Sequence, residues 1–489
     1  MLTARNIRYD VADRARAVNC GGIGAIHLLA RRVGLIEAID RDVELLKVHL
    51  PYHESDHVLN IAYNILCGGD CLQDLELLRN DEAYLDALGA GRVPDPTTAG
   101  DFCRRFGSAE SVIGLMDAIN RVRLGVWKQQ PPEFFERAVI DADGTIAPTG
   151  GQCKAGMDIG YDGRWGYHPL VMSLANTREP LYLLNRSGNR PSHEDAATYF
   201  DKCIAWCRRA GFKSILLRGD TDFTQSRELD RWDDERVEFV FGIDAMANLV
   251  RHAENLPESA WKPLTRPARY EVKTAPRQRP DNVKESVVVR RQFQNIRLAG
   301  EDVAEFSYRP TACRKLYRLV VVRKNLSVRK GESVLFDDVR YFFYISNLQG
   351  RSPEELVFLA NDRCNQENLI EQLKNGVHAM KLPVDNLISN WAYMVMASLA
   401  WSLKAWYGLM LPEATGRGAA GHAAARQRRG EQKRRIVTME FKAFVAHLVR
   451  LPCQILKSGR RLIYRLLSYD PWQEPLLAGA AAWRTRRQC

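Results

Sequence analysis

Two aspartates that directly follow a short apolar run are the first residues whose types and spacing could support catalysis. Residues 138–140 are apolar and partly β-branched, which is typical of a buried strand. The run leads into Asp141 and Asp143, and then into Gly144, which permits a sharp change of direction. Because buried carboxylates are costly unless a cation neutralises them, a divalent metal is the usual partner of such a pair. Taken alone, either aspartate could equally cap a turn.

The next strands place a third aspartate near the first two. Residues 137–241 show three meandering strands, a helix, a fourth strand, a helix and a fifth strand, which is the order of a ribonuclease-H-like core. Asp220 follows the fourth strand, residues 214–219. Since acids at the ends of the first and fourth strands of this core lie side by side, we expect Asp143 and Asp220 to be neighbours. The predicted fold class is therefore mixed α/β.

A charged helix supplies a fourth acid. Residues 352–376 predict a helix that is broken near Asn361 and stopped at Gly376. At about 100° per residue, Arg363, Glu367 and Lys374 share one face of this helix. The spacing alone is also typical of a simple ladder of ion pairs.

Together these motifs resemble those of the DDE transposases of bacterial insertion sequences, in particular the cut-and-paste group with a β-strand insertion before the final Glu. The signature of that group is Tyr, two residues, Arg, three residues, Glu, six residues, Lys. Arg363, Glu367 and Lys374 match it, whereas Ala360 stands at the Tyr position. The two aspartate motifs of the family match Asp143-Gly-Thr and Arg-Gly-Asp220.

The resemblance implies that Asp143, Asp220 and Glu367 are catalytic and bind two Mg²⁺ ions, for which Mn²⁺ substitutes, with Arg363 and Lys374 on the flanking phosphates. The implied reaction is hydrolysis at the terminal inverted repeats, through a hairpin, followed by joining of the 3′-OH ends to target DNA. The hairpin needs an aromatic platform for a flipped base, and Trp261 or an aromatic residue of the insertion is a candidate.

Two other functions fit parts of the sequence. A haloacid-dehalogenase-like phosphatase would use Asp141 as nucleophile and Asp143 as acid/base, but it leaves Glu367 and the basic C-terminal segment unexplained. A catalytically inactive, transposase-derived DNA-binding protein would keep DNA binding without cleavage. The intact set of acids argues against this second alternative.

Composition favours a polyanionic partner. The net charge is +11 and the pI is about 9.1, in a chain of 489 residues that is 46% hydrophobic and 26% charged. The 11 cysteines are scattered without a CxxC pair, and the N-terminal residues lack an apolar signal segment, so we expect free thiols and a cytoplasmic, bacterial, nucleoid-associated protein. Residues 391–411 are expected to form a buried helix because Lys404 interrupts them.

The expected organisation has five parts. Residues 1–130 form a helical region for DNA-end binding and dimer contacts, 131–261 the first part of the core, 262–350 an antiparallel β insertion that includes residues 287–293, 351–411 the rest of the core, and 412–489 a basic helical region. Double-stranded DNA, at the transposon ends and at the target, and a second copy of the chain in a homodimer are the expected partners. The residues expected to contact DNA outside the core are Arg104 and Arg105, on a helix capped by Thr97 or Thr98, and Arg428, Arg429, Lys433, Arg434 and Arg435, in a solvated loop.

Overall fold

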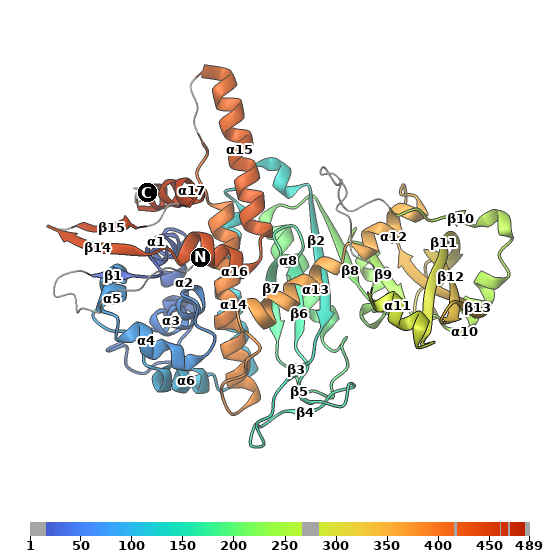
Figure 1. Cartoon of the computed structure of the whole chain (residues 1–489), viewed down its shortest axis with the longest axis horizontal. Helices are drawn as coiled ribbons and strands as arrows, with labels where there is room; N and C mark the ends of the chain where they lie inside the picture. The colour runs from blue at the N-terminus through green and yellow to red at the C-terminus, as the bar shows by residue number, and fades with distance from the viewer. Residues whose placement is uncertain (1–15, 267–282, 415–417, 460, 468–469, 485–489) are drawn as a thin grey trace.

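The computed structural model describes residues 16–266, 283–414, 418–459, 461–467 and 470–484 (Figure 1). A large mixed sheet lies at the centre. The N-terminal helices and the C-terminal elements lie together beside one end of it, and the long strands of the insertion form its other end (Figure 1).

The central sheet has nine strands in the order β10-β11-β12-β13-β9-β8-β2-β6-β7. β2 is parallel to β8, and β8 is parallel to β9, whereas β2, β6 and β7 are antiparallel neighbours. The order β7-β6-β2-β8-β9 confirms the predicted ribonuclease-H-like core. Its strands are β2 (Arg137–Gly144), β6 (Leu170–Leu174), β7 (Glu179–Leu184), β8 (Ser214–Gly219) and β9 (Glu238–Ile243).

Three helices and a small sheet complete the first part of the core. The helix expected between the fourth and fifth strands begins at Leu229, after a 3-10 turn at Thr221–Phe223. The helices are α8 (Ala196–Ala210), α9 (Leu229–Asp234) and α10 (Ala247–Glu254), and the small sheet contains β3 (Ala147–Pro148), β4 (Asp158–Ile159) and β5 (Trp165–Tyr167).

The insertion extends the core sheet. β13 (Ser333–Ser346) pairs antiparallel with β9 and with β12 (Tyr317–Lys330), which pairs with β11 (Gln294–Tyr308) beside β10 (Lys262–Pro263). The expected antiparallel strands are therefore present. Residues 283–290, part of which we predicted as strand, instead form the exposed helix α11 (Val283–Arg290), since their β-branched side chains find no buried strand partner there.

Alternation along β2 decides which side chains face which layer. Ala138, Ile140 and Ala142 belong to the core cluster that includes α8, whereas Val139 packs on the cluster that contains Leu356 of α12. Successive side chains of a strand point to opposite faces. Asp141 and Asp143 therefore lie on the same face as Val139, toward α12 (Pro353–Asn361) and α13 (Cys364–Glu371).

The predicted break near Asn361 separates these two helices. Ser352 caps α12 in a reciprocal box with Glu355, as the sequence predicts. α13 continues into a π-helix, Gln372–Gly376. Its wider turn changes the angular spacing after residue 371, so the regular wheel that placed Lys374 on the face of Arg363 does not apply to the whole segment.

The long helix α14 (Leu387–Leu409) packs between the core sheet and the N-terminal helices and is almost wholly buried, as predicted (Figure 1). Lys404 lies within it, and its ammonium group donates to the carbonyls of Val437 and Met439. Within the described ranges, no helix has the length and apolarity that crossing a membrane requires. The N-terminal helices are α1 (Ile23–Arg32), α2 (Leu35–Asp42), α3 (Glu54–Leu66), α4 (Leu75–Arg79), α5 (Glu82–Leu88), α6 (Pro96–Arg105) and α7 (Ala109–Trp127).

The C-terminal elements return to the N-terminal helices. β14 (Cys453–Ser458) pairs with β15 (Arg461–Leu466) and with β1 (Ala17–Val18). The segment that we expected to be a solvated loop is instead helix α15 (Gly418–Thr438), which projects from the body (Figure 1). It packs along α14, and that contact stabilises a helix that charge repulsion would oppose. α16 (Phe441–Phe444) and α17 (Gln473–Arg484) complete the described helices.

Candidate active site

Asp141, the first aspartate of β2, is fully engaged inside the protein. Its two carboxylate oxygens accept hydrogen bonds from Nε and Nη2 of Arg218 on β8, at 2.7 and 2.8 Å. The side chains of Asp141 and Arg218 are 1% and 5% exposed. A carboxylate whose two oxygens both accept hydrogen bonds from one buried guanidinium is not available to attack a phosphate. This geometry argues against the phosphatase alternative.

Asp143 and Asp220, at the ends of the adjacent parallel strands, share one cation. Nη1 of Arg363 lies 3.0 Å from Oδ2 of Asp143 and 3.8 Å from Oδ2 of Asp220. Asp220 follows β8 directly, and its side chain also accepts the Asp222 amide at 3.1 Å. The two residues are therefore neighbours, as the strand order predicted.

The electrostatics of the pair indicate a place for positive charge. Burial raises the pKa of Asp143 to about 7, the Arg363 guanidinium opposes this rise, and the Asp220 and Glu367 carboxylates add to it. Burial likewise raises the pKa of Asp220, again against Arg363. Each shift marks a carboxylate that is costly to ionise in place, so additional positive charge here would stabilise both ionised forms.

Glu367 and Lys374 flank this pair without completing a close cluster. Glu367, on α13, is exposed, and its charge acts on both Asp143 and Arg363. Lys374, in the π-helix, is half-buried, and burial lowers the pKa of its ammonium group. Gln366 holds α13 on the sheet, because its side chain donates to the Val171 carbonyl at 2.9 Å.

Two cavities open beside the aspartates. One, of about 610 Å³, includes Asp143, Asp220, Tyr161, His168 and Arg190 in its lining. The other, of about 360 Å³, lies between the end of β13 and the break between α12 and α13. Its lining includes Asp220, Arg363, Ala360, Asn361, Tyr341, Phe342 and Tyr344. Acidic residues thus lie between a polar groove and a pocket rich in aromatic side chains.

Close packing at Gly144 holds the first of these cavities in shape. A Cβ atom on Gly144 would lie 2.8 Å from Nε2 of His168, whose Nδ1 is 2.8 Å from the Arg190 carbonyl oxygen. His168 is 3% exposed, and burial lowers its pKa. Gly144 is therefore needed for the close approach of the imidazole, whereas the turn that we expected there is absent, because Gly144 ends β2 and pairs with Leu170.

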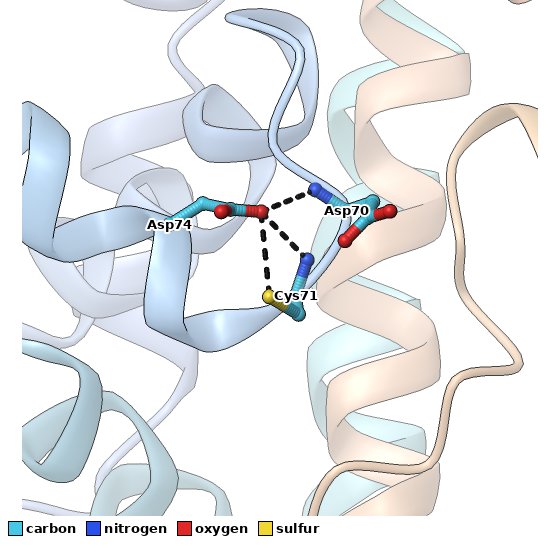
Figure 2. A group of neighbouring side chains, drawn as sticks. All are labelled: Asp70, Cys71 and Asp74. Atoms are coloured by element: carbon cyan, nitrogen blue, oxygen red, sulfur yellow. Dashed lines mark hydrogen bonds between the residues drawn. The ribbon is translucent and has the colours of Figure 1, made fainter.

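A different set of potential ligands lies in the N-terminal region. Asp70, Cys71 and Asp74 are, among the described residues, the one group of three whose candidate ligand atoms all lie within 4.8 Å of one another (Figure 2). Oδ2 of Asp74 accepts the amides of Asp70 and Cys71 at 2.8 and 3.2 Å and the Cys71 thiol at 3.4 Å. These hydrogen bonds cap the 3-10 turn that follows, which explains the cluster as local structure.

The basic residues expected to contact DNA fall into two groups. Arg104 and Arg105 lie exposed at the end of α6, and Arg104 pairs with Asp101 and Asp385. Asp95, rather than Thr97 or Thr98, caps this helix, because its carboxylate accepts the Thr98 amide. On α15, Arg428, Arg434 and Arg435 are exposed and Lys433 pairs with Glu413.

Arg429 is placed differently from the other expected DNA contacts on α15. Its side chain is 3% exposed and pairs with Glu474 of α17 at 2.6 Å. Helical periodicity explains the difference, since one face of α15 is covered while the opposite face remains open. A prediction of a loop assigns no residue to a helix face, so it could not distinguish Arg429 from its exposed neighbours.

The structure also identifies site residues that sequence reasoning did not assign. The pairing of Arg218 with Asp141, the anchoring of α13 by Gln366, and the contact of His168 with Gly144 all join segments distant in sequence. For the pair of Arg218 and Asp141, the available signal was an arginine in the fourth strand of the core beside two acids in the first strand. For the other two, the sequence contains no comparable signal.

Parallel strands that end in paired acids, on a ribonuclease-H-like sheet interrupted by a β insertion, define an enzyme core of the DDE class. The chain belongs to the family described as transposase DDE domain group 1, whose model matches residues 4–487. It is thus a DDE transposase. Among solved structures, it is similar to a piggyBac transposase in a synaptic complex with hairpin DNA, with 10% identity, a TM-score of 0.36, and coverage of 96% of this chain and 86% of that one. No curated protein matches it.

Proposed function

We propose that this transposase binds the terminal inverted repeats of its own insertion sequence, hydrolyses the DNA at those ends and joins the freed 3′-OH ends to target DNA. One observation carries the proposal: Asp143 and Asp220 share a single guanidinium at the ends of adjacent strands, beside Glu367. The family generally uses divalent metals, and this donor set fits them.

Asp143, Asp220 and Glu367 are the proposed ligands. All three offer hard oxygen atoms, which suit Mg²⁺, and Mn²⁺ is expected to substitute. When bound, two such ions would activate the attacking water and stabilise charge on the leaving 3′ oxygen. Asp143 would hold the ions together with Asp220 and Glu367, since the charges of both act on its carboxylate. Lys374 would hold a flanking phosphate.

The aromatic pocket is the proposed site for an extruded base, should the ends be cleaved through a hairpin. Tyr341, Phe342 and Tyr344 line this pocket beside Asp220. Trp261 is a poorer platform, because it is 8% exposed and the Arg323 guanidinium lies 4.4 Å from its ring centre. The Tyr344 hydroxyl, which donates to Asn361 at 3.4 Å, lines the same pocket as Ala360 and would bind the phosphate in place of the missing signature Tyr.

The remaining contacts would be made outside the core. Exposed arginines of α6 and α15 would bind DNA phosphates, and two copies of the chain would bring two ends together in the cytoplasm, at the nucleoid. The helical region 1–130 is the proposed contact for the end sequence and for the second copy.

The test is cleavage of duplex DNA that carries the inverted repeats flanking the coding region. We expect Mg²⁺-dependent nicking by the wild type, its loss in Glu367→Gln, and retained band shifts in both. Glu371→Gln is the matched control, since Glu371 lies exposed one turn along the same helix and bonds only Asn375 among the described side chains. Cleavage by Glu367→Gln would refute the role of that residue. Specific binding without nicking in Mg²⁺ or Mn²⁺ would instead support an inactive DNA-binding protein.

A further inference from the structure

Arg363 lies where a cation that serves both aspartates would have to lie. Its Nη1 atom is 3.0 Å from Asp143 and 3.8 Å from Asp220, and its side chain is 19% exposed. Three carboxylates, those of Asp143, Asp220 and Glu367, act on its charge, with Asp141 as a fourth and weaker influence. A guanidinium in this position neutralises the repulsion that these carboxylates would otherwise exert on one another.

This contact differs from the other arginine–aspartate pair of the sheet. Arg218 bonds Asp141 through two nitrogens and also donates to the Leu359 carbonyl at 3.0 Å. Arg363 donates one hydrogen bond to Asp143, through one nitrogen. A single hydrogen bond from a long side chain is easier to exchange than a bidentate pair that is also tied to the backbone.

The surroundings of Arg363 allow its side chain to turn. The residue lies at the junction between α12 and α13, where the chain leaves one helix and enters the next. It also lines the pocket of about 360 Å³, whose lining includes Asp220 but not Asp143. The free volume of this pocket gives the guanidinium a second place to lie.

Resting on the function proposed above, we propose that Arg363 is a positioning residue that occupies the cation site in the metal-free enzyme. It holds Asp143 and Asp220 together until a divalent cation takes its place, and it then turns toward the DNA. The guanidinium lies at Oδ2 of each aspartate, so a metal ion that takes these two oxygens competes with it for them. Because of this competition, Arg363 is free to bind a DNA phosphate only after the carboxylates have bound the metal ion.

Competition predicts that removal of Arg363 strengthens metal binding, which is the opposite of what loss of a structural support would do. We expect Arg363→Gln to bind Mn²⁺ about tenfold more tightly in the absence of DNA, since a charge-assisted hydrogen bond is worth about one order of magnitude. The measurement is titration calorimetry with Mn²⁺ alone, with free Mn²⁺ counted by electron paramagnetic resonance.

Lys374→Gln is the matched control, because it removes a nearby positive charge that contacts neither aspartate, and its Mn²⁺ affinity should change by less than about twofold. Arg363→Lys should give an intermediate affinity, and it replaces Arg363→Gln should that variant fail to fold. Thermal unfolding adds a second readout: Arg363→Gln should unfold at a lower temperature than the wild type without metal, and saturating Mn²⁺ should close the difference.

Asp143→Asn separates failure of the inference from failure of the proposed function. If the wild type binds Mn²⁺ through Asp143 while Arg363→Gln binds it equally or more weakly, the placeholder role is refuted and the metal site stands. If Asp143→Asn leaves Mn²⁺ binding unchanged, the proposed metal site is itself refuted, and the role of Arg363 with it.

Discussion

Two acidic side chains on the central sheet are neutralised in opposite ways. Glu179, on β7, is completely buried, and its two oxygens accept hydrogen bonds at 2.7–3.1 Å from donors on two helices, Arg123, Trp127 and Trp406. Asp143, on β2, is 14% exposed and has one side-chain donor, Arg363, which it shares with Asp220. The first carboxylate is saturated by fixed groups, and the second keeps free lone pairs beside two cavities.

The difference separates a structural acid from a functional one. A carboxylate whose two oxygens already accept three hydrogen bonds from rigid helices can take a new ligand only by losing bonds that its burial requires. A carboxylate with one exchangeable partner can accept a cation at a smaller cost. Donor saturation, rather than burial alone, therefore distinguishes the two sites, since both carboxylates lie largely out of water.

The largest expected effect comes from breaking the saturated site. Arg123→Met would leave the Glu179 charge buried without its cation, so we expect the free energy of unfolding to fall by about 3–5 kcal/mol. Urea denaturation followed by tryptophan fluorescence measures this change, because Trp127 and Trp406 both contact Glu179.

The control for that variant is Arg208→Met on α8. Arg208 pairs with Glu235 at 3.1 Å, and both side chains are well exposed, at 47% and 39%. Such a surface pair contributes about 0–1 kcal/mol. If Arg123→Met lowered the free energy of unfolding by no more than Arg208→Met does, the interpretation of Glu179 as a structural anchor would be wrong.

A sharper comparison sets Asp141 against Asp143, two residues apart on the same face of β2. Asp141→Asn weakens a buried bidentate bond, so we expect it to lower the free energy of unfolding by about 2–3 kcal/mol. Asp143→Asn loses one shared hydrogen bond but also removes repulsion from Asp220 and Glu367, so its stability should change by less than about 1 kcal/mol.

Activity should follow the reverse order. We expect the rate of DNA cleavage, corrected for the folded fraction, to fall more than about 100-fold in Asp143→Asn and clearly less in Asp141→Asn. A residue that only supports a metal ligand typically costs up to about 100-fold when it is changed, so a larger loss indicates a ligand. The phosphatase-like assignment predicts the reverse ranking of these activities, so the same two variants also test it.

Much of this site could be predicted because local sequence patterns indicate the strands and their order. The apolar runs before Asp143 and Asp220 indicated the strands, and the order of elements indicated that their ends are adjacent. The cap at Ser352 and the break near Asn361 were equally local. Pairings between distant side chains were not predictable in this way: no pattern in the sequence assigns Arg363 to two aspartates more than a hundred residues away.

The errors have physical causes of the same kind. Residues 283–290 have the composition of a strand, but an exposed segment without a pairing partner is free to form a helix. Residues 418–438 are rich in charge, but they also contain good helix formers and pack along α14. The π-turn at 372–376 shifts Lys374 in a way that a regular wheel cannot represent.

A smaller effect is expected where the packing beside Asp143 is tight. In Gly144→Ala the new methyl group would lie 2.8 Å from Nε2 of His168, which cannot retreat without losing its bond to the Arg190 carbonyl. We expect a stability loss of about 1–2 kcal/mol by urea denaturation and a measurable fall in cleavage. Gly150→Ala is the control, since nothing lies within 4 Å of its added Cβ. His168→Ala should rescue part of the loss, and absence of coupling between the two changes would contradict the contact.

The smallest effect compares a buried, paired arginine with an exposed one on α15. Arg428 is exposed and has no partner side chain among the residues that the structure describes, whereas the neighbouring Arg429 is bonded to Glu474. Each arginine on a DNA phosphate contributes about one unit to the dependence of log affinity on log salt concentration. We therefore expect Arg428→Gln to reduce that slope by about 1 in fluorescence-anisotropy titrations with duplex DNA, and Arg429→Gln to leave the slope unchanged while lowering the unfolding temperature. Equal slopes for the two variants would mean that the ion pair with Glu474 does not keep Arg429 from DNA, and that burial in the free protein fails to predict which basic groups bind.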